Sequence, residues 1–139
     1  MITIQKFKKN EVNYILKWFA NPDNRRYQNT KIIDLEKAKK LIATTKNKKV
    51  FCIKLNEVPI GYCMIKGLPK NPEIGITIDK KFWGQGFGKE AMFLLENEAR
   101  KIGINKIGLI VKKKNQRAIN LYKKLKYKDS FIIMEKELN

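Results

Sequence analysis

Histidine is absent from this chain of 139 residues. Its absence excludes catalytic triads that use an imidazole, histidine-ligated metals and proton transfer by histidine. Any proton transfer must therefore use carboxylates, tyrosine, lysine, cysteine or water. Cysteine is almost as rare, because Cys52 and Cys63 are the only two. Both lie in apolar runs, which is typical of buried thiols, and we expect no metal site.

Long apolar runs are absent as well. No stretch approaches the roughly 18 apolar residues of a membrane span, and residues 1–10 lack the apolar centre of a signal peptide. We therefore expect a cytoplasmic protein without membrane contact. The length and the hydrophobic content of 43% predict one globular domain, residues 1–139, with a sizeable core.

Arginine is scarce although positive charge is not. The net charge is +18, but arginine stands only at positions 25, 26, 100 and 117. Arginine is the preferred side chain for specific phosphate and base contacts, and the lysines are scattered over every segment. We interpret most of this charge as a solvated surface. Attraction of an anionic ligand is the second interpretation, and nucleic acid is the weaker candidate partner.

Apolar periodicity predicts elements in the order β-α-α-β-β-β-α-β-α-β. This order favours an α/β (α+β) fold, with a mixed, mostly antiparallel central sheet and helices on both faces. The expected strands cover residues 2–7, 50–55, 60–66, 72–79, 106–111 and 131–138, and the expected helices cover 10–20, 34–43, 86–102 and a segment capped by Asn115.

The stretch 83–89, Trp-Gly-Gln-Gly-Phe-Gly-Lys, carries most of the chemical information. Its alternating glycines lie between a strand-like run and a helix-like run. Glycine lets a backbone approach a phosphate closely, and a helix N-terminus offers unpaired N–H groups and a positive dipole end. The pattern predicts a cradle for a phosphorylated ligand. It is neither a P-loop, since Glu90 follows Lys89, nor a dinucleotide fingerprint, since the last glycine spacing is wrong.

A second motif follows in residues 115–127. Asn115, Ala118, Tyr122 and the aromatic Tyr127 have the spacing found downstream of such a loop in the GNAT family of N-acetyltransferases, which the chain resembles over nearly its whole length. Trp18 followed by Asn21-Pro22-Asp23, and Trp83-Gly84-Gln85-Gly86, resemble the branch of ribosomal-protein N-terminal acetyltransferases most. The resemblance implies a GNAT-like domain that uses acetyl-coenzyme A.

The resemblance also implies a role for individual residues. The backbone N–H groups of residues 85–89 would bind the pyrophosphate, and the main chain of the preceding strand would bind the pantetheine arm. The expected cofactor-binding residues are Ile76, Thr77, Ile78, Trp83, Gly84, Gln85, Gly86, Phe87, Gly88, Lys89, Asn115, Ala118 and Tyr122.

Catalysis is assigned to a few residues by the same resemblance. The Ile78 backbone N–H would donate to the thioester oxygen, and Tyr122 would protonate the departing thiolate. Glu73 is the candidate general base, with Asp23 and Asp79 as weaker alternatives. For Tyr122 the competing interpretation is a core position on its helix, and for Glu73 a surface carboxylate. The acceptor would meet Asp23, Arg25, Tyr27 and Glu73.

Lys126 replaces the usual glycine of the motif, and only Asp129 and Ser130 separate Lys128 from the last expected strand. We therefore expect an acceptor site that is open or completed by another subunit, in a monomer or a homodimer. The acceptor is a small-molecule or peptide amine. A charge of +18 repels polyamines and favours an anionic amine, such as a nucleotide-linked amino sugar, or a protein N-terminus on an RNA-bearing particle. The alternative function is a non-catalytic module that binds coenzyme A or nucleic acid.

Overall fold

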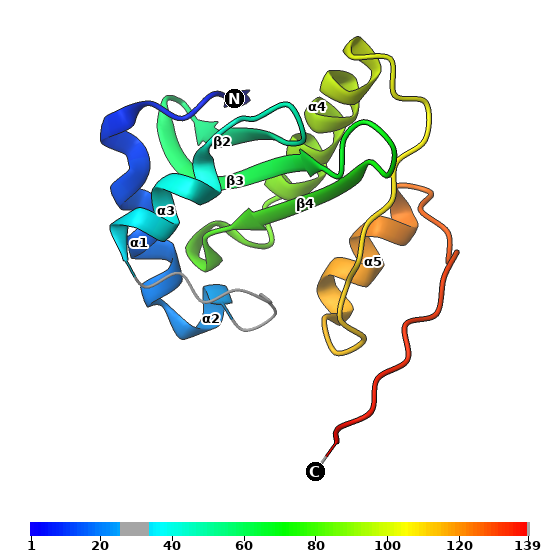
Figure 1. Cartoon of the computed structure of the whole chain (residues 1–139). Helices are drawn as coiled ribbons and strands as arrows, with labels where there is room; N and C mark the ends of the chain where they lie inside the picture. The colour runs from blue at the N-terminus through cyan, green and yellow to red at the C-terminus, as the bar shows by residue number, and fades with distance from the viewer. Residues whose placement is uncertain (26–33, 139) are drawn as a thin grey trace.

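A computed structural model describes residues 1–25 and 34–138, so Tyr27 lies outside the described residues. Its centre is an antiparallel sheet in the order β1 (Ile2–Gln5), β2 (Lys49–Leu55), β3 (Val58–Lys66) and β4 (Glu73–Ile78) (Figure 1). The hairpin between β2 and β3 turns through Asn56 and Glu57, both at positive φ. This is the backbone that a two-residue hairpin turn needs. The strands expected at 50–55 and 60–66 are thus confirmed, and they pair as a hairpin.

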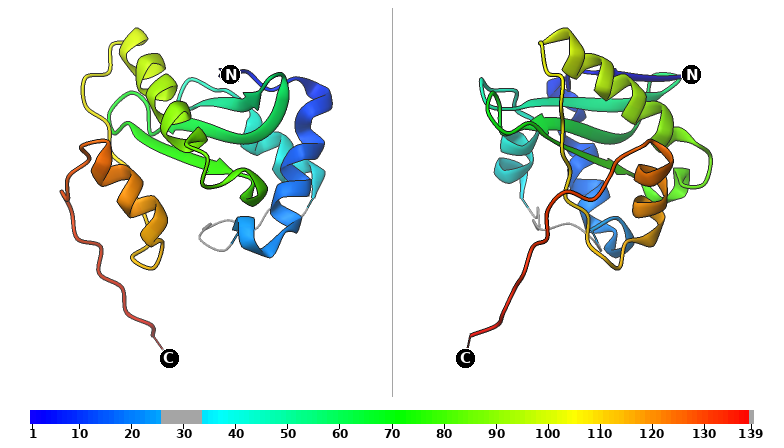
Figure 2. Two further views of the ribbon diagram at one scale, coloured as in Figure 1. Left: turned by 180° about the vertical axis from the view of Figure 1, so that it is seen from behind. Right: turned by 90° about the vertical axis from the view of Figure 1, so that its right-hand side faces the viewer.

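Helices cover both faces of the sheet, as predicted (Figures 1 and 2). Two turns of 3-10 helix, Lys9–Glu11 and Lys80–Phe82, precede α1 and Trp83 respectively. Asp34 caps α3 by accepting a hydrogen bond from the Lys37 backbone N–H at 2.8 Å. The helices are α1 (Val12–Ala20), α2 (Pro22–Arg25), α3 (Leu35–Ile42), α4 (Phe87–Lys101) and α5 (Gln116–Lys124).

The sheet separates two apolar clusters. On one face, Met92 and Leu95 of α4 pack against the isoleucines of the sheet, including Ile74. On the other face, Trp18 and Phe19 of α1 stack on Tyr62, with ring centroids 6.4 and 6.2 Å apart. The β4 side chains therefore divide by the alternation of a strand, with Ile74, Ile76 and Ile78 facing α4. No helix in the described residues is long and apolar enough to span a membrane.

One ion pair is buried in this frame. The Nζ of Lys54 lies 2.7 Å from a carboxylate oxygen of Glu11, and only 1% of the Lys54 side chain is exposed. Burial alone would raise the pKa of Glu11, but hydrogen bonds from Lys54 and the Lys8 backbone outweigh it and lower that pKa. Cys52 and Cys63 are buried free thiols, as expected, and burial raises the pKa of Cys52 to about 12.

Two predicted strands are wrong. Residues 106–111 meet β4 only at Gly108, whose O accepts from the Ile74 N–H at 2.9 Å and whose N–H donates to Pro72 at 3.0 Å. Residues 131–138 extend from the body without strand structure. Both sequences have strand propensity, but a strand forms only where a neighbouring edge pairs with it. Over residues 1–25 and 34–138, the sheet therefore has four strands and is antiparallel, with one parallel bridge at Gly108.

Candidate functional site

The glycine turn between β4 and α4 has a left-handed backbone. Gly84 has φ +77°, and Gly86, the N-cap of α4, has φ +82°. Among the described residues, and apart from its chain neighbours, nothing lies within 4 Å of where a Cβ would stand at either glycine, so the turn faces open space. Gly88 serves packing instead, because a Cβ there would lie 3.4 Å from Leu121 and 3.7 Å from Ile78.

Unused backbone donors gather at this turn. Within the described residues, the N–H groups of residues 85–89 donate no hydrogen bond, and the first backbone bond into α4 is Glu90 N–H to Gly86 O at 3.2 Å. No side chain caps the helix. A helix start with open donors and a positive dipole end is suited to an anion such as phosphate.

The outer edge of β4 is open beside the turn. The Ile74 N–H bonds to Gly108, so the backbone groups of Ile74, Ile76 and Ile78 point away from β3, by the alternation of an antiparallel strand. The Ile78 carbonyl accepts from the Trp83 indole at 2.7 Å. Ile76 lies between these two occupied positions. Neither its N–H nor its carbonyl has a partner on this edge among the described residues.

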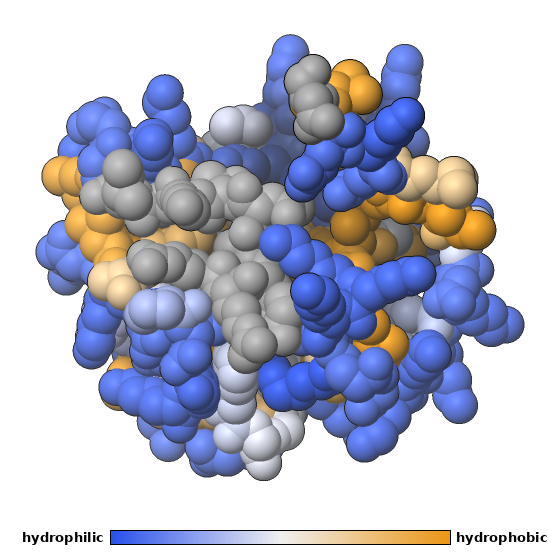
Figure 3. Space-filling view, turned by 90° about the horizontal axis from the view of Figure 1, so that it is seen from below, coloured by the Kyte–Doolittle hydropathy of each residue, from blue (hydrophilic) through white to orange (hydrophobic). Residues whose placement is uncertain are grey.

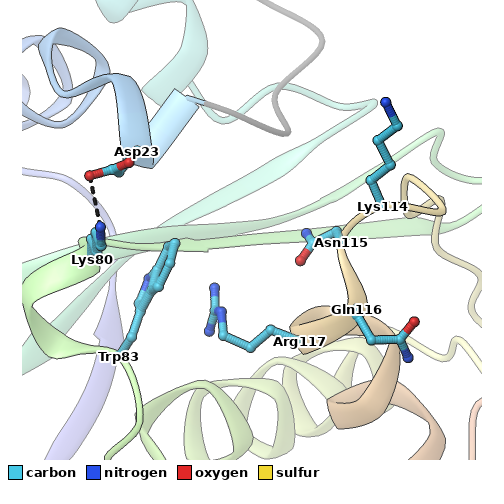
Figure 4. A pocket seen from close by; sticks show the side chains of 7 residues that line it. All are labelled: Asp23, Lys80, Trp83, Lys114, Asn115, Gln116 and Arg117. Atoms are coloured by element: carbon cyan, nitrogen blue, oxygen red, sulfur yellow. Dashed lines mark hydrogen bonds and ion pairs between the residues drawn. The ribbon is translucent and has the colours of Figure 1, made fainter.

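A shallow pocket of about 230 Å³ adjoins the turn (Figure 4). The Arg117 guanidinium lies over the Trp83 ring, 3.7 Å from its centroid, which is a cation–π contact. Seen from below, the described surface is mostly hydrophilic, with apolar areas toward its margins (Figure 3). The pocket is lined by Asp23, Lys80, Trp83, Lys114, Asn115, Gln116 and Arg117.

A buried amide ties α2 to this region. Asn24 is 8% exposed; its Nδ2 donates to Asp79 at 3.1 Å, and its Oδ1 accepts from the Lys80 N–H at 2.7 Å. Lys80 Nζ also pairs with Asp23 at 2.8 Å. These bonds join residues more than fifty positions apart. They bring the expected acceptor residue Asp23 beside the glycine turn.

Helix α5 carries Asn115, Ala118 and Tyr122. The Asn115 side chain accepts from the Ala118 N–H at 3.3 Å, which makes it the helix cap. Tyr122 is half-buried against Tyr127, with ring centroids 5.9 Å apart. Burial raises the pKa of Tyr122, and Arg117 partly offsets the rise. The phenol therefore stays protonated at neutral pH, in the form that can donate a proton.

Glu73 lies at the opposite end of β4 from the glycine turn. It is five positions from Ile78, which is about 16 Å along a strand. Its carboxylate pairs with Lys66 at 3.1 Å, and its side chain is 29% exposed. The structure thus brings Asp23, Trp83 and Asn115 together but leaves Glu73 apart from them.

The remaining candidates fall in several environments. Thr77 bonds to the Tyr62 hydroxyl on the α1 face, and by the alternation of β4 its main chain faces β3, so Thr77 is not open at the outer edge. Phe87 packs against the core, whereas Gln85 and Lys89 are exposed. Arg25 ends α2, and Tyr27 is outside the described residues.

Sequence reasoning missed Asn24, Lys80, Lys114 and Arg117. Arg117 had a signal, because arginine is rare here and this one stands inside the second motif. The three others had none, because a buried asparagine and two surface lysines look ordinary until the fold joins α2, β4 and α5.

Known proteins share the sequence pattern and the fold of this chain. The model of the Acetyltransferase (GNAT) family matches residues 10–127. The uncharacterized N-acetyltransferase YycN of Bacillus subtilis (strain 168) is 30% identical over 95 residues, which are 64% of this chain and 61% of that protein. The match therefore spans less than two thirds of the relative's length.

Solved structures agree on the fold. Spermidine N-acetyltransferase from Vibrio cholerae, in complex with CoA and spermine, has a TM-score of 0.81 at 17% identity, over 99% of this chain and 88% of that chain. The ribosomal-protein-S18-alanine N-acetyltransferase from Escherichia coli has a TM-score of 0.73 at 17% identity, over 94% and 80%. The predicted α+β fold with helices on both faces is confirmed.

Proposed function

This chain belongs to the acetyltransferase (GNAT) family, and we propose that it transfers the acetyl group of acetyl-coenzyme A to a primary amine. One observation carries the proposal: the open helix start at Gly86 adjoins an open strand edge at Ile76. The helix start can bind a pyrophosphate. The strand edge can bind the amide groups of a pantetheine arm, as it would bind a neighbouring strand. Together they fit a long ligand with a phosphate at one end and a thioester at the other.

The fit of coenzyme A rests on the backbone. Residues 85–89 would hold the pyrophosphate through their N–H groups, with Lys80 and Arg117 as nearby cations. Gly84 and Gly86 keep the turn in a backbone that other residues adopt only with strain. Solved structures of two GNAT-fold neighbours carry CoA, which supports the same cosubstrate here.

The donor to the thioester oxygen is better assigned to Ile76 than to Ile78. The pantetheine arm is long, so the thioester must lie well away from the pyrophosphate, toward the middle of β4. The Trp83 indole donates to the Ile78 carbonyl, and Gly108 occupies the edge at Ile74. The Ile76 N–H is an open donor between these two positions. Ile76 also lies about 10 Å along the strand from Glu73, whereas Ile78 lies about 16 Å from it.

The reaction needs a base and an acid. The amine nitrogen attacks the thioester carbon, the new C–N bond replaces the C–S bond, and the amine proton leaves. We assign that proton to Glu73, through water, and the proton for the departing thiolate to the Tyr122 phenol. The raised pKa of Tyr122 supports the second assignment, because the phenol is protonated before each turnover. Asp23 is the alternative base, since it lines the pocket.

For the acceptor we propose an amine that also carries negative charge. The net charge of +18 disfavours polycations, and Lys80, Lys114 and Arg117 outnumber Asp23 in the pocket. A protein N-terminus, as in the ribosomal-protein branch, is the second choice. Arg25 and Tyr27 would border the acceptor.

The test begins with calorimetric titration of acetyl-coenzyme A at two salt concentrations, with 3′,5′-ADP as the control. We expect stoichiometric binding that exceeds the control and survives salt. Thiol release with a panel of anionic amines, N-terminal peptides and spermidine then ranks the acceptors. Binding that equals the control and collapses with salt would contradict the proposal and favour a polyanion-binding module.

A second pair of variants shows whether Glu73 or Asp23 is the base. Glu73→Gln should lower kcat by about a hundredfold, with little change in acetyl-coenzyme A affinity. Asp23→Asn should act mainly on the KM of the acceptor. The reverse pattern would make Asp23 the base.

A further inference from the structure

The positive charge of this chain is not spread evenly along the sequence. Residues 99–128 contain eleven basic side chains and neither aspartate nor glutamate, so these 30 residues carry +11 of the net charge of +18. Residues 1–98, by contrast, contain 19 basic and ten acidic side chains, which is the mixture of an ordinary solvated surface. A basic segment without acids is typical of a surface that meets a polyanion.

The fold brings much of this charge to one side of the molecule. After α4 the segment meets β4 at Gly108 and then returns as α5, so that residues 102–115 and α5 lie side by side (Figures 1 and 2). Six exposed lysines stand just before α5 and at its C-terminal end. We call them the basic flank: Lys112, Lys113, Lys123, Lys124, Lys126 and Lys128.

No acid of the described chain neutralises the basic flank. Over residues 1–25 and 34–138, none of its six lysine side chains forms an ion pair. The acids that follow in the sequence, Asp129, Glu135 and Glu137, lie on the segment that extends from the body (Figure 1). Like charges that have no counter-charge repel one another, and a polyanion from outside would relieve that repulsion.

The lysines of the basic flank form two groups at the two ends of α5. The helix between them spans nine residues, Gln116–Lys124, and is therefore about 13 Å long. Gln116 and Asn120 are exposed between the groups, and their amides share a hydrogen bond of 2.8 Å. Lysine and amide side chains are common donors to phosphate oxygens. The major groove of B-form DNA is about 12 Å wide, so the two groups can reach phosphates on both sides of such a groove.

The chemistry of the basic flank favours a nucleic acid over other polyanions. Helices that lie on a membrane surface set large apolar side chains beside their cations, but α5 exposes Gln116 and Asn120 there. Protein interfaces are enriched in arginine and depleted of lysine, and the six cations are all lysine. Lysine acts as a point charge, whereas specific contacts to guanine use the arginine fork most often. The flank is therefore suited to phosphates and not to bases.

We propose that the basic flank binds the phosphate backbone of a nucleic acid without reading its sequence. None of its six lysines lines the pocket at Trp83, so nucleic acid and acetyl-coenzyme A can be bound at the same time. This binding does not depend on acetyl transfer.

The first test is titration of a short labelled RNA duplex with the full chain, followed by fluorescence anisotropy at several salt concentrations. For wild type, the logarithm of affinity should fall linearly and steeply with the logarithm of salt concentration. A triple variant, Lys123→Gln, Lys124→Gln and Lys128→Gln, should bind about tenfold or more weakly, and its salt slope should be smaller by about two to three. A wild type that does not bind the duplex would overturn the proposal.

The matched control loses the same charge on the other side of the molecule. Its changes are Lys37→Gln, Lys40→Gln and Lys46→Gln, in α3 and the turn after it, and all three residues are exposed. This control should keep the wild-type salt slope and an affinity within about threefold of wild type. Both variants should keep the wild-type circular dichroism spectrum. Equal weakening by the two triple variants would mean that net charge alone acts, and the proposal would be wrong.

The second test separates the basic flank from the pocket. Saturating acetyl-coenzyme A should leave the affinity for the duplex unchanged within about twofold, and the flank variant should bind acetyl-coenzyme A as wild type does. Competition between the two ligands would place the nucleic acid in the pocket and overturn the proposal. No acceptor amine is present in these titrations, so their outcome is independent of whether the proposed acetyl transfer occurs.

The third test identifies the class of polyanion. Duplexes of different sequence should bind with the same affinity within about threefold, because only the phosphates are contacted. Vesicles that contain phosphatidylserine should bind more weakly than the duplex. A strong preference for one sequence, or for the vesicles, would contradict backbone binding by the flank.

Discussion

Helices α4 and α5 begin beside the same pocket, and they begin differently. Helix α4 starts at a glycine with φ +82° and no side-chain cap, which leaves its first N–H groups open. Helix α5 starts at Asn115, whose side chain takes the Ala118 N–H. A side-chain cap satisfies one of the first N–H groups of a helix, whereas an uncapped start leaves them all to water or a ligand. We infer that α4 contributes backbone donors to the site and α5 contributes side chains, Arg117 and Tyr122.

The largest expected effect tests the side-chain contribution of α5. Tyr122→Phe removes only the hydroxyl, and kcat should fall by about a hundredfold or more, with acetyl-coenzyme A affinity unchanged. The control is Tyr127→Phe, which removes the bond to Glu96 and should reduce stability more than kcat. Steady-state kinetics by thiol release measure both. An equal effect of the two variants on kcat would make Tyr122 a packing residue.

The next effect tests the open start of α4. Gly86→Ala forces a side chain into a left-handed backbone, and acetyl-coenzyme A affinity should fall roughly tenfold, or about 1.4 kcal/mol. Gly103→Ala is a close control, because Gly103 has φ +83° and equally open surroundings at the other end of α4. Both variants should lose similar stability, but only the first should lose affinity in calorimetric titration. Equal affinities would remove the turn from the site.

Arg117 should have a smaller effect. Arg117→Met keeps an apolar contact with Trp83 but removes the charge, so affinity should fall about threefold to tenfold. The salt dependence of binding should weaken at the same time. Arg100→Met, at the far end of α4, removes the same charge outside the pocket and serves as the control. If both variants weaken binding equally, the effect comes from net charge alone.

Asn115→Ala tests the claim that Asn115 acts as the cap of α5. Loss of the cap should cost about 1 kcal/mol of unfolding free energy, with acetyl-coenzyme A affinity unchanged within twofold. Urea denaturation and calorimetry measure the two quantities. A fall in affinity without a fall in stability would show that Asn115 contacts the ligand.

The pH profile should show the smallest change of all. Burial raises the pKa of Tyr122 above its ordinary value of about 10, so the acid form is fully present below that pH and is lost only above it. The wild-type kcat should therefore show no decline caused by Tyr122 below about pH 10. In that range Tyr122→Phe should leave the shape of the pH profile unchanged. A decline near neutral pH that disappears in that variant would contradict the assignment.

Local patterns predicted most of this architecture because the physical causes are local. Asp34 caps α3 and Asn115 caps α5 through bonds three residues long, and the alternation of β4 predicts which side chains face α4. Residues 106–111 and 131–138 have equally good strand sequences, but strand formation depends on an edge elsewhere in space. The hydrogen bonds of Asn24 could not be predicted from the sequence for the same reason, since their partners lie more than fifty residues away.

The stacked pair of Arg117 and Trp83 gives the site an optical reporter. The chain has two tryptophans. Trp18 is only 2% exposed and packs in the aromatic cluster with Tyr62. Trp83 is half-buried at the pocket, where its emission responds to the cation above it and to the hydrogen bond of its indole. Intrinsic fluorescence can therefore follow occupation of the pocket in real time without a label, against a constant background from Trp18.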